Sequence, residues 1–361
     1  VYAYIANPKY AAGIGADGIV TCGTGLAPVN FTSHNAGVAL WRKRGAQYSG
    51  VAGNLIKWQL AMIWLKYARK GNSGTIEGCS SYYWGYPAAV SETAATRIVV
   101  TEANAILDGC SVAIGLVAEG GTFDQWGANK YNVFKHKRIK SIESVTISGT
   151  KYKAINLELA AGETIDTVAG RTYISSVPYA SGWNDGVLGY DGSRINCTNG
   201  KEPGLIQRTE FQNGAYLILS DELWQWETEA DGSYSLNCYT CHDQSKVTTN
   251  GTISADYEKQ SDLALVFATD HGDKWTYIED VAIGADPGIL WPAKVSTAAG
   301  SGTGVKAGFY AQPRSSGVRA GWCCCLLNYH GNAGLAARSS DNGTTGSYWY
   351  AAVGAPSGIS G

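Results

Sequence analysis

One stretch of the chain has apolar residues at helical spacing. Within residues 53–70 they recur at steps of three and four, as Leu55, Trp58, Met62 and Leu65, and Ile56, Ile63 and Trp64 widen the stripe. Steps of this size place side chains on one face of an α-helix. The pattern predicts a core helix that packs on a sheet and ends at the Gly-Asn pair that follows residue 70.

A second pattern consists of short apolar and β-branched runs separated by turns that contain glycine. Such runs predict strands. They lie at residues 98–100, 144–147, 154–157 and 173–177. We therefore expect residues 97–180 to be a small β-rich insertion. It would divide a larger domain into an N-terminal part, residues 1–96, and a C-terminal part, residues 181–361.

The C-terminal part is rich in Gly, Asn, Asp and Ser, and its predicted strands are short. From residue 296 onward, glycine and serine turns alternate with aromatic side chains. Loops of this kind on a rigid scaffold are common sites of binding specificity. The pattern therefore favours a recognition surface near the C-terminus.

Composition narrows the classes of function. The chain has 361 residues, with 28 Lys and Arg against 30 Asp and Glu, so its formal net charge is −2. A nucleic-acid partner is not expected, because such proteins carry a basic surface. Membrane insertion is not expected either, because no apolar run reaches 18 residues. The 12 Trp and 22 Tyr residues favour recognition, because these side chains offer large contact areas at low entropic cost.

The sharpest local motif is a CxxCH sequence formed by Cys238, Cys241 and His242. Such a motif can attach haem, or it can bind zinc together with a distant ligand such as His271. The favoured interpretation is a polar loop with two thiols or one local disulfide, and thus no metal and no cofactor. Trp183-Asn184-Asp185 resembles a calcium ligand set, but a turn is favoured because Glu202-Pro203-Gly204 lacks the partner amide.

No catalytic sequence motif is present, so we do not expect an enzyme. The neighbouring acidic residues Asp221 and Glu222 do not nominate a catalytic pair, because chance adjacency is expected among 30 acidic residues. The one basic cluster, residues 135–140, is interpreted as a solvated turn.

An ordered series of short segments resembles a known family. The segments are Lys9-Tyr10, Trp58 to Tyr67, Ser181-Gly182, Val187 to Gly189, Asp191 to Ser193, Ile206 to Glu210, Asn213-Gly214, Leu223 to Trp226, Leu290 to Pro292, Gly317 to Cys325, Gly331 to Leu335 and Gly346 to Trp349. They resemble the C-type lectin fold in its formylglycine-generating-enzyme-like branch. Within that branch they resemble the phage variable proteins of diversity-generating retroelements, of the major tropism determinant type.

The resemblance implies an α+β fold with short strands, one or two core helices and long loops. It also implies a ligand-display region at about residues 309–350. Oxidase activity is not implied, because the paired catalytic cysteines of that enzyme have no clear counterpart. The expected ligand-binding residues are Tyr310, Arg319, Trp322, Asn328, Tyr329, His330, Arg338, Asp341, Asn342, Tyr348 and Trp349.

The consecutive cysteines 323–325 fall in this display region. Adenine-directed mutagenesis of Asn codons can produce cysteine, which would explain the run. Alternatively, the cysteines are small buried apolar residues on one strand face.

The function expected from these observations is that of a receptor-binding or adhesion protein on a virion, in a phage tail or fibre. Its partners would be a host cell-surface protein or glycan and other virion proteins, and it would form a homo-oligomer, with a trimer as one possibility. Two alternatives are a structural virion or surface protein that uses the same face for subunit contacts, and a redox or metal protein that uses the CxxCH sequence.

Overall fold

The structure is a computed structural model, and it shows a β-rich chain. It describes residues 8–26, 29, 32–71, 85–104, 106, 108–124, 128–175, 181–182, 185–189, 192–193, 195, 204–210, 216–260, 265–283, 290–296, 305, 307–323, 338–340, 343–345 and 351–352. Strands make up 42% of the structure and helices 10%. The predicted α+β class is therefore wrong. The physical reason is that the C-terminal part, where only short strands were expected between Gly- and Asn-rich turns, forms strands of up to 13 residues that pair mostly antiparallel.

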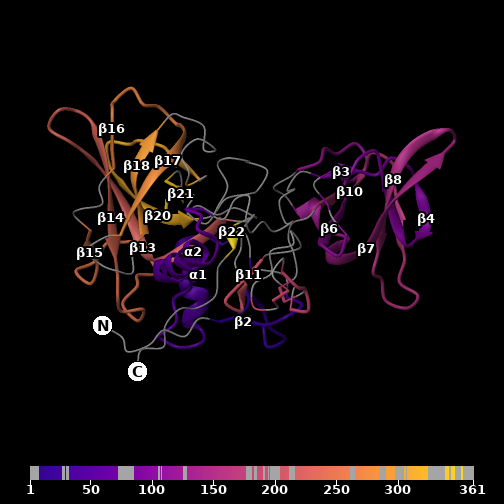
Figure 1. Cartoon of the computed structure of the whole chain (residues 1–361), viewed down its shortest axis with the longest axis horizontal. Coiled ribbons are helices and arrows are strands. Elements are labelled where there is room, and N and C mark those ends of the chain that lie inside the picture. The colour runs from indigo at the N-terminus through magenta and orange to yellow at the C-terminus, as the bar shows by residue number, and fades with distance from the viewer. Residues whose placement is uncertain are drawn as a thin grey trace.

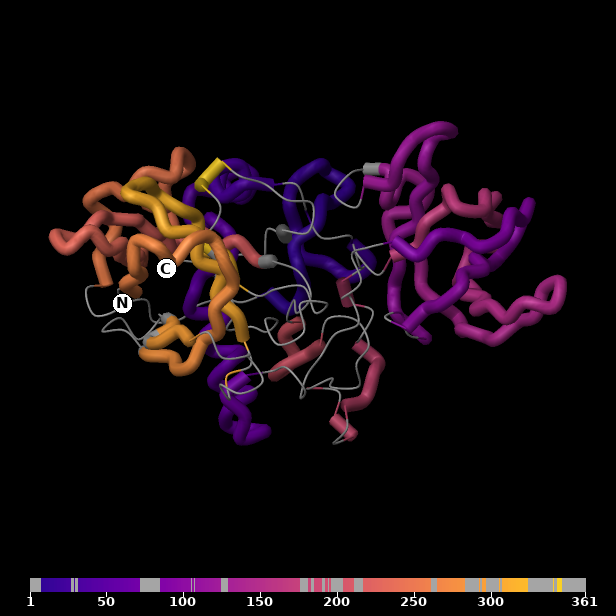
Figure 2. The backbone as a smooth tube through the Cα atoms, turned by 90° about the horizontal axis from the view of Figure 1, so that it is seen from above, coloured from indigo at the N-terminus to yellow at the C-terminus, as the bar shows by residue number. Residues whose placement is uncertain are grey.

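Two large sheets lie at opposite ends of the molecule's long axis (Figure 1), and the view from above shows the same separation (Figure 2). One sheet has six strands, and we call it and its surroundings, residues 86–175, the six-stranded lobe. Its strand order is β3 (Tyr86–Pro87), β10 (Thr172–Ser175), β6 (Ser111–Leu116), β7 (Phe134–Ile147), β8 (Thr150–Leu157) and β5 (Arg97–Val100). Beside it, β4 (Glu92–Ala95) pairs with β9 (Ile165–Thr167), and a 3-10 turn, η1, spans Ala128–Lys130.

The six-stranded lobe has an apolar core of its own. Ile98, Ile114, Ile155 and Ile174 are all fully buried in it. The strands predicted at 98–100, 144–147 and 154–157 are confirmed as parts of β5, β7 and β8, and the one predicted at 173–177 overlaps β10. Because β3 and β4 also belong to this lobe, it includes residues on the N-terminal side of residue 97.

The other sheet has ten strands, and it forms the ten-stranded lobe together with the two helices. Its main path is β15 (Glu258–Lys259), β14 (Tyr234–Thr240), β13 (Tyr216–Thr228), β20 (Gly317–Cys323), β21 (Arg338–Ser339), β19 (Gly308–Ala311), β17 (Lys274–Ile283) and β18 (Leu290–Ser296). Off this path, β16 (Leu265–Phe267) pairs with β14, and β22 (Ala351–Ala352) pairs with β13. Two small hairpins join β1 (Ala12–Ile14) to β2 (Val20–Cys22) and β11 (Leu205–Ile206) to β12 (Thr209–Glu210).

This sheet is strongly curled around an aromatic core. Trp224 on β13 stacks with Phe309 on β19 at 6.1 Å between ring centroids, although two other strands separate β13 from β19 in the sheet. Phe267 on β16 contacts Trp226 at 5.6 Å and Phe309 at 6.0 Å. Contacts between strands that are not neighbours require the sheet to fold over its concave face. The core of the lobe therefore lies against the concave face of this sheet, and buried residues of the second helix also belong to it.

Helices α1 (His34–Arg42) and α2 (Gly53–Tyr67) pack against β13. The core helix is confirmed, but only part of the predicted stripe is buried. Ile56, Leu60 and Ile63 are fully buried, whereas Leu65 is 80% exposed. The apolar residues of α2 lie on nearly all sides, so their spacing does not single out one face. The helix also ends earlier than predicted, with Ala68 in a left-handed conformation at φ 52°.

Candidate ligand-binding face

The structure describes only part of the predicted display region. Tyr310, Arg319 and Trp322 have described side chains, and Arg338 has a described backbone in β21. The remaining predicted residues, which are Asn328, Tyr329, His330, Asp341, Asn342, Tyr348 and Trp349, lie outside the described residues. The site is therefore built here from the strands around Tyr310.

Trp322 does not belong to an exposed face. It is 1% exposed and packs in the main apolar core, opposite Ile218 of β13. The expectation that it contacts a ligand at the surface is wrong, because the curled sheet encloses this end of β20. The neighbouring Cys323 is fully buried and is not in a disulfide bond, which matches the interpretation of that cysteine as a small apolar residue. Arg319 is half-buried, and its Nη1 donates to the carbonyl of Val318 at 3.3 Å.

Tyr310 lies on the convex face of the sheet, beside Trp275. The two residues are directly opposite each other on β19 and β17, and their rings lie 5.3 Å apart at 59°. Their strand neighbours Phe309 and Thr276 are buried, so the alternation of side chains places Trp275 and Tyr310 on the other face. Both are half-buried, and Tyr277 follows Trp275 on that face by the same alternation.

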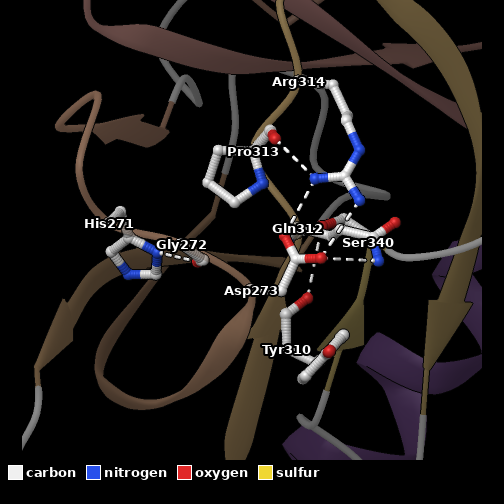
Figure 3. Close-up of polar contacts among 8 residues, drawn as sticks. All are labelled: His271, Gly272, Asp273, Tyr310, Gln312, Pro313, Arg314 and Ser340. Carbon is white, nitrogen blue, oxygen red and sulfur yellow. Dashed lines mark hydrogen bonds and ion pairs between the residues drawn. The ribbon is translucent and has the colours of Figure 1, made fainter.

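A polar cluster borders these aromatic residues at the start of β17 (Figure 3). Arg314 forms a bidentate ion pair with Asp273, with Nη1–Oδ1 at 2.8 Å and Nη2–Oδ2 at 3.1 Å. Gln312 donates its amide to the same carboxylate at 3.1 Å. The hydrogen bond from Arg314 lowers the pKa of Asp273, and Asp273 raises the pKa of Arg314. Both groups therefore stay charged at neutral pH.

Hydrogen bonds from Ser340 fix the backbone beneath this cluster. Ser340 is fully buried, and its amide donates to the Tyr310 carbonyl at 3.0 Å. Its hydroxyl donates to the same carbonyl at 3.2 Å and accepts a hydrogen bond from the backbone amide of Gln312 at 3.3 Å. Tyr310 and Gln312 are thus tied to the segment that carries β21 (Figure 3).

Trp275, Asp273 and Gln312 are part of this site but were not among the ligand-binding residues expected from the sequence. A signal for Trp275 is present in the run Trp275 to Ile278, in which aromatic residues alternate with Thr and Ile. Such alternation is typical of a strand with one exposed face. No sequence signal marks the ion pair between Asp273 and Arg314, because the partners are 41 residues apart.

The CxxCH residues do not converge on a metal site. Cys238 is buried in the main core, whereas Cys241 packs in a separate cluster with Val38 and Tyr257. Neither cysteine is in a disulfide bond, and burial raises the pKa of Cys241 to about 11. His242 is exposed and lies 3.8 Å from Glu258. Among the described residues, no group of three or more His, Cys, Asp or Glu side chains is arranged to hold a metal ion.

The predicted turn at Trp183-Asn184-Asp185 is described only at Asp185. This carboxylate forms an ion pair with Lys9 at 2.8 Å and accepts a hydrogen bond from the Tyr10 hydroxyl. Both of its oxygens thus have protein partners.

A buried polar network beside β13 contains a carboxyl group with a raised pKa. Asp221 accepts a hydrogen bond from the Gly53 amide at 2.9 Å, at the start of α2, and burial raises its pKa to about 7. Ser49 contacts both Ser220, at 3.1 Å, and Gln244. The adjacent cavity has a volume of about 10 Å³, which is space for a single water molecule. The network therefore stabilises the joint between α2 and β13 and offers no room for a substrate.

Comparison with known proteins does not indicate a function for this face. No protein-family model matches the chain, and a search of curated proteins finds no significant relative. Neither described helix has the length and apolar character needed to cross a membrane.

Proposed function

We propose that this chain is a receptor-binding or adhesion protein that contacts a host-surface ligand through the convex side of β17 and β19. We call this surface the aromatic face and define it as Asp273, Trp275, Tyr277, Tyr310, Gln312 and Arg314. The observation that carries the proposal is the paired rings of Trp275 and Tyr310 beside a fixed polar cluster.

The aromatic face has the physical properties of a recognition surface. Trp275 also packs against the main core, and the backbone of Tyr310 is tied to Ser340, so the strands that carry the two rings are held in place before a partner binds. Rigid aromatic anchors surrounded by polar groups are typical of the residues that dominate binding energy. The Asp273–Arg314 pair offers both a donor and an acceptor at the rim while contributing no net charge.

The ligand we propose is a cell-surface protein or glycan with one flat apolar patch and several hydrogen-bonding groups. One small face of this size binds weakly, so we expect several copies of the chain to act together. A homo-oligomer, such as a trimer, on the tail or fibre of a virion would present them. The virion setting rests on the sequence resemblance alone.

The proposal is tested by the binding of fluorescently labelled full-length chain to a panel of intact bacterial strains, measured by flow cytometry. We expect at least one strain to bind, and Trp275→Ala and Tyr310→Ala each to weaken that binding at least tenfold. Tyr152→Ala is the matched control, because Tyr152 is a half-buried tyrosine on β8 of the other lobe. Unchanged binding by both face variants would contradict the proposal. Loss of self-association in the variants, with no strain bound by the parent chain, would favour subunit contacts instead.

A further inference from the structure

A polar cleft opens in the six-stranded lobe, away from the aromatic face. Its volume is about 550 Å³, and its walls come from β7, β8 and the segment that follows β8. Small-molecule sites commonly have volumes of about 300–1,000 Å³. The cleft is therefore large enough for a ligand of the size of one sugar ring.

A bulge in β7 shapes one side of the cleft. Ile139 pairs with Leu157, but Ser141 pairs with Asn156, so Lys140 is an extra residue in the strand. A bulge of this kind bends the strand and redirects its side chains. Lys140, Ser141, Asn156 and Leu157 all line the cleft.

The opposite wall is held in place by an ion pair. Lys137 on β7 contacts both oxygens of Glu163, at 2.7 and 2.6 Å, and Glu163 also accepts from the Ala160 amide at 2.9 Å. The pair lowers the pKa of Glu163. These contacts hold the segment after β8 in a fixed position and neutralise the charge of Glu163.

Three polar side chains in the cleft orient one another. Ser141 donates to Oε1 of Glu143 at 2.9 Å, and Asn156 donates to Ser141 at 2.9 Å and to the same Glu143 oxygen at 3.0 Å. Within the described residues, Oε2 of Glu143 and Oδ1 of Asn156 have no hydrogen-bonding partner in the protein. Two acceptors with fixed positions therefore remain for hydroxyl groups of a ligand.

The charges and the floor of the cleft restrict the ligand further. Lys140 and Glu143 carry opposite charges, and Glu163 is neutralised by Lys137, so the lining has no net charge and does not favour an anion. Leu159 contributes a partly exposed apolar side chain to the lining, whereas Leu157 is only 4% exposed. A ring with C–H groups on one face and neighbouring hydroxyls at its edge matches this combination.

From this geometry we propose that the cleft of the six-stranded lobe binds a neutral saccharide unit, with its hydroxyls on Glu143 and Asn156 and its ring against Leu159. This binding site is separate from the aromatic face and does not depend on the function proposed for that face.

The test is a titration of the full chain with methyl glucoside, methyl galactoside and N-acetylglucosamine, followed by ligand-observed NMR, with inorganic phosphate as the charged probe. We expect saturable binding of at least one sugar, with a Kd on the order of 1 mM for so small a ligand. Thr96→Trp places an indole at the exposed edge of the cleft and should weaken that binding at least tenfold. Glu143→Gln, which keeps the shape but changes one acceptor into a donor, should weaken it as well.

Thr150→Trp is the matched control, because Thr150 is an exposed threonine at the β7–β8 turn and does not line the cleft. It should retain sugar binding, and all three variants should unfold at the temperature of the parent chain. Absence of binding by every sugar, binding of phosphate alone, or sugar binding that Thr96→Trp leaves unchanged would overturn the proposal. Tyr310→Ala should retain sugar binding, and Thr96→Trp should retain cell binding. The proposal for the cleft and the proposal for the aromatic face can therefore fail independently of each other.

Discussion

Burial assigns the aromatic residues of the C-terminal part to two roles, one in the core and one at the surface. Trp322 and Tyr310 lie in the same glycine-rich part of the chain, yet one is enclosed in the core and the other is half-buried on the convex face. We therefore expect Trp322→Ala to lower the free energy of unfolding by about 3–5 kcal/mol, as is typical of a deleted core aromatic residue. Tyr310→Ala should cost about 1 kcal/mol or less. Urea denaturation of both variants measures the difference, and equal losses would contradict this assignment.

Asp221 makes stability depend on pH in a predictable direction. Burial raises its pKa to about 7, while Glu222 raises it and the Gly53 amide lowers it by smaller amounts. In the unfolded chain the pKa of an aspartate is about 3.9. The folded state therefore holds this proton more tightly, and the stabilisation that is complete below about pH 4 is lost as the pH rises towards 7.

Asp221→Asn should remove this dependence while it keeps the acceptor for the Gly53 amide. Denaturant unfolding at pH 5 and at pH 8 should show a smaller loss of stability in the variant than in the parent chain. An identical loss in both proteins would show that Asp221 does not titrate in this range.

The environment of a single residue could be predicted from the sequence where its neighbours along the chain determine that environment. It could not be predicted where segments distant in the sequence determine it. The enclosure of Trp322 depends on how β13 and β19 meet across the curled sheet, and the cluster at Asp273 depends on Arg314 in the loop between β19 and β20. Neither relation leaves a periodic pattern in the sequence.

At the scale of elements, α2 ends with a residue that is poorly suited to its conformation. Ala68 has φ 52° and ψ 39°, a left-handed conformation that costs a residue with a Cβ about 1–2 kcal/mol. Ala68→Gly should therefore raise the free energy of unfolding by about 1 kcal/mol. Ala61→Gly, in the middle of the same helix, is the control and should lower it by about 1 kcal/mol. A destabilised Ala68→Gly variant would contradict the end of the helix described here.

The sequence predicted the elements with strong local periodicity and missed those defined by pairing. The core helix and four strands of the six-stranded lobe follow from their apolar spacing. The face of α2 could not be predicted, because apolar residues surround the helix. The 13 residues of β13 and the 10 of β17 were not predicted as long strands, because the Gly- and Asn-rich segments near them resemble loops.

At the scale of the whole molecule, the two lobes have separate cores, so damage to one should leave the other folded. Gly115 on β6 passes η1 so closely that a Cβ there would lie 1.8 Å from the carbonyl oxygen of Asn129. Gly115→Ala should therefore increase hydrogen exchange in β6 and β7 while β13 and β14 stay protected. Gly186→Ala is the control, because a Cβ there meets no atom within 4 Å. Loss of protection in both lobes would show that they unfold as one unit.

The central claim is that the aromatic face of the ten-stranded lobe contacts the host ligand. Hydroxyl-radical footprinting of the labelled chain, free and bound to a strain that it recognises, tests this contact directly. The account predicts that Trp275 and Tyr310 become at least several-fold less oxidised on binding, while Tyr152 of the other lobe is unchanged. Oxidation of Trp275 and Tyr310 at the same rate in the bound and free protein would contradict it.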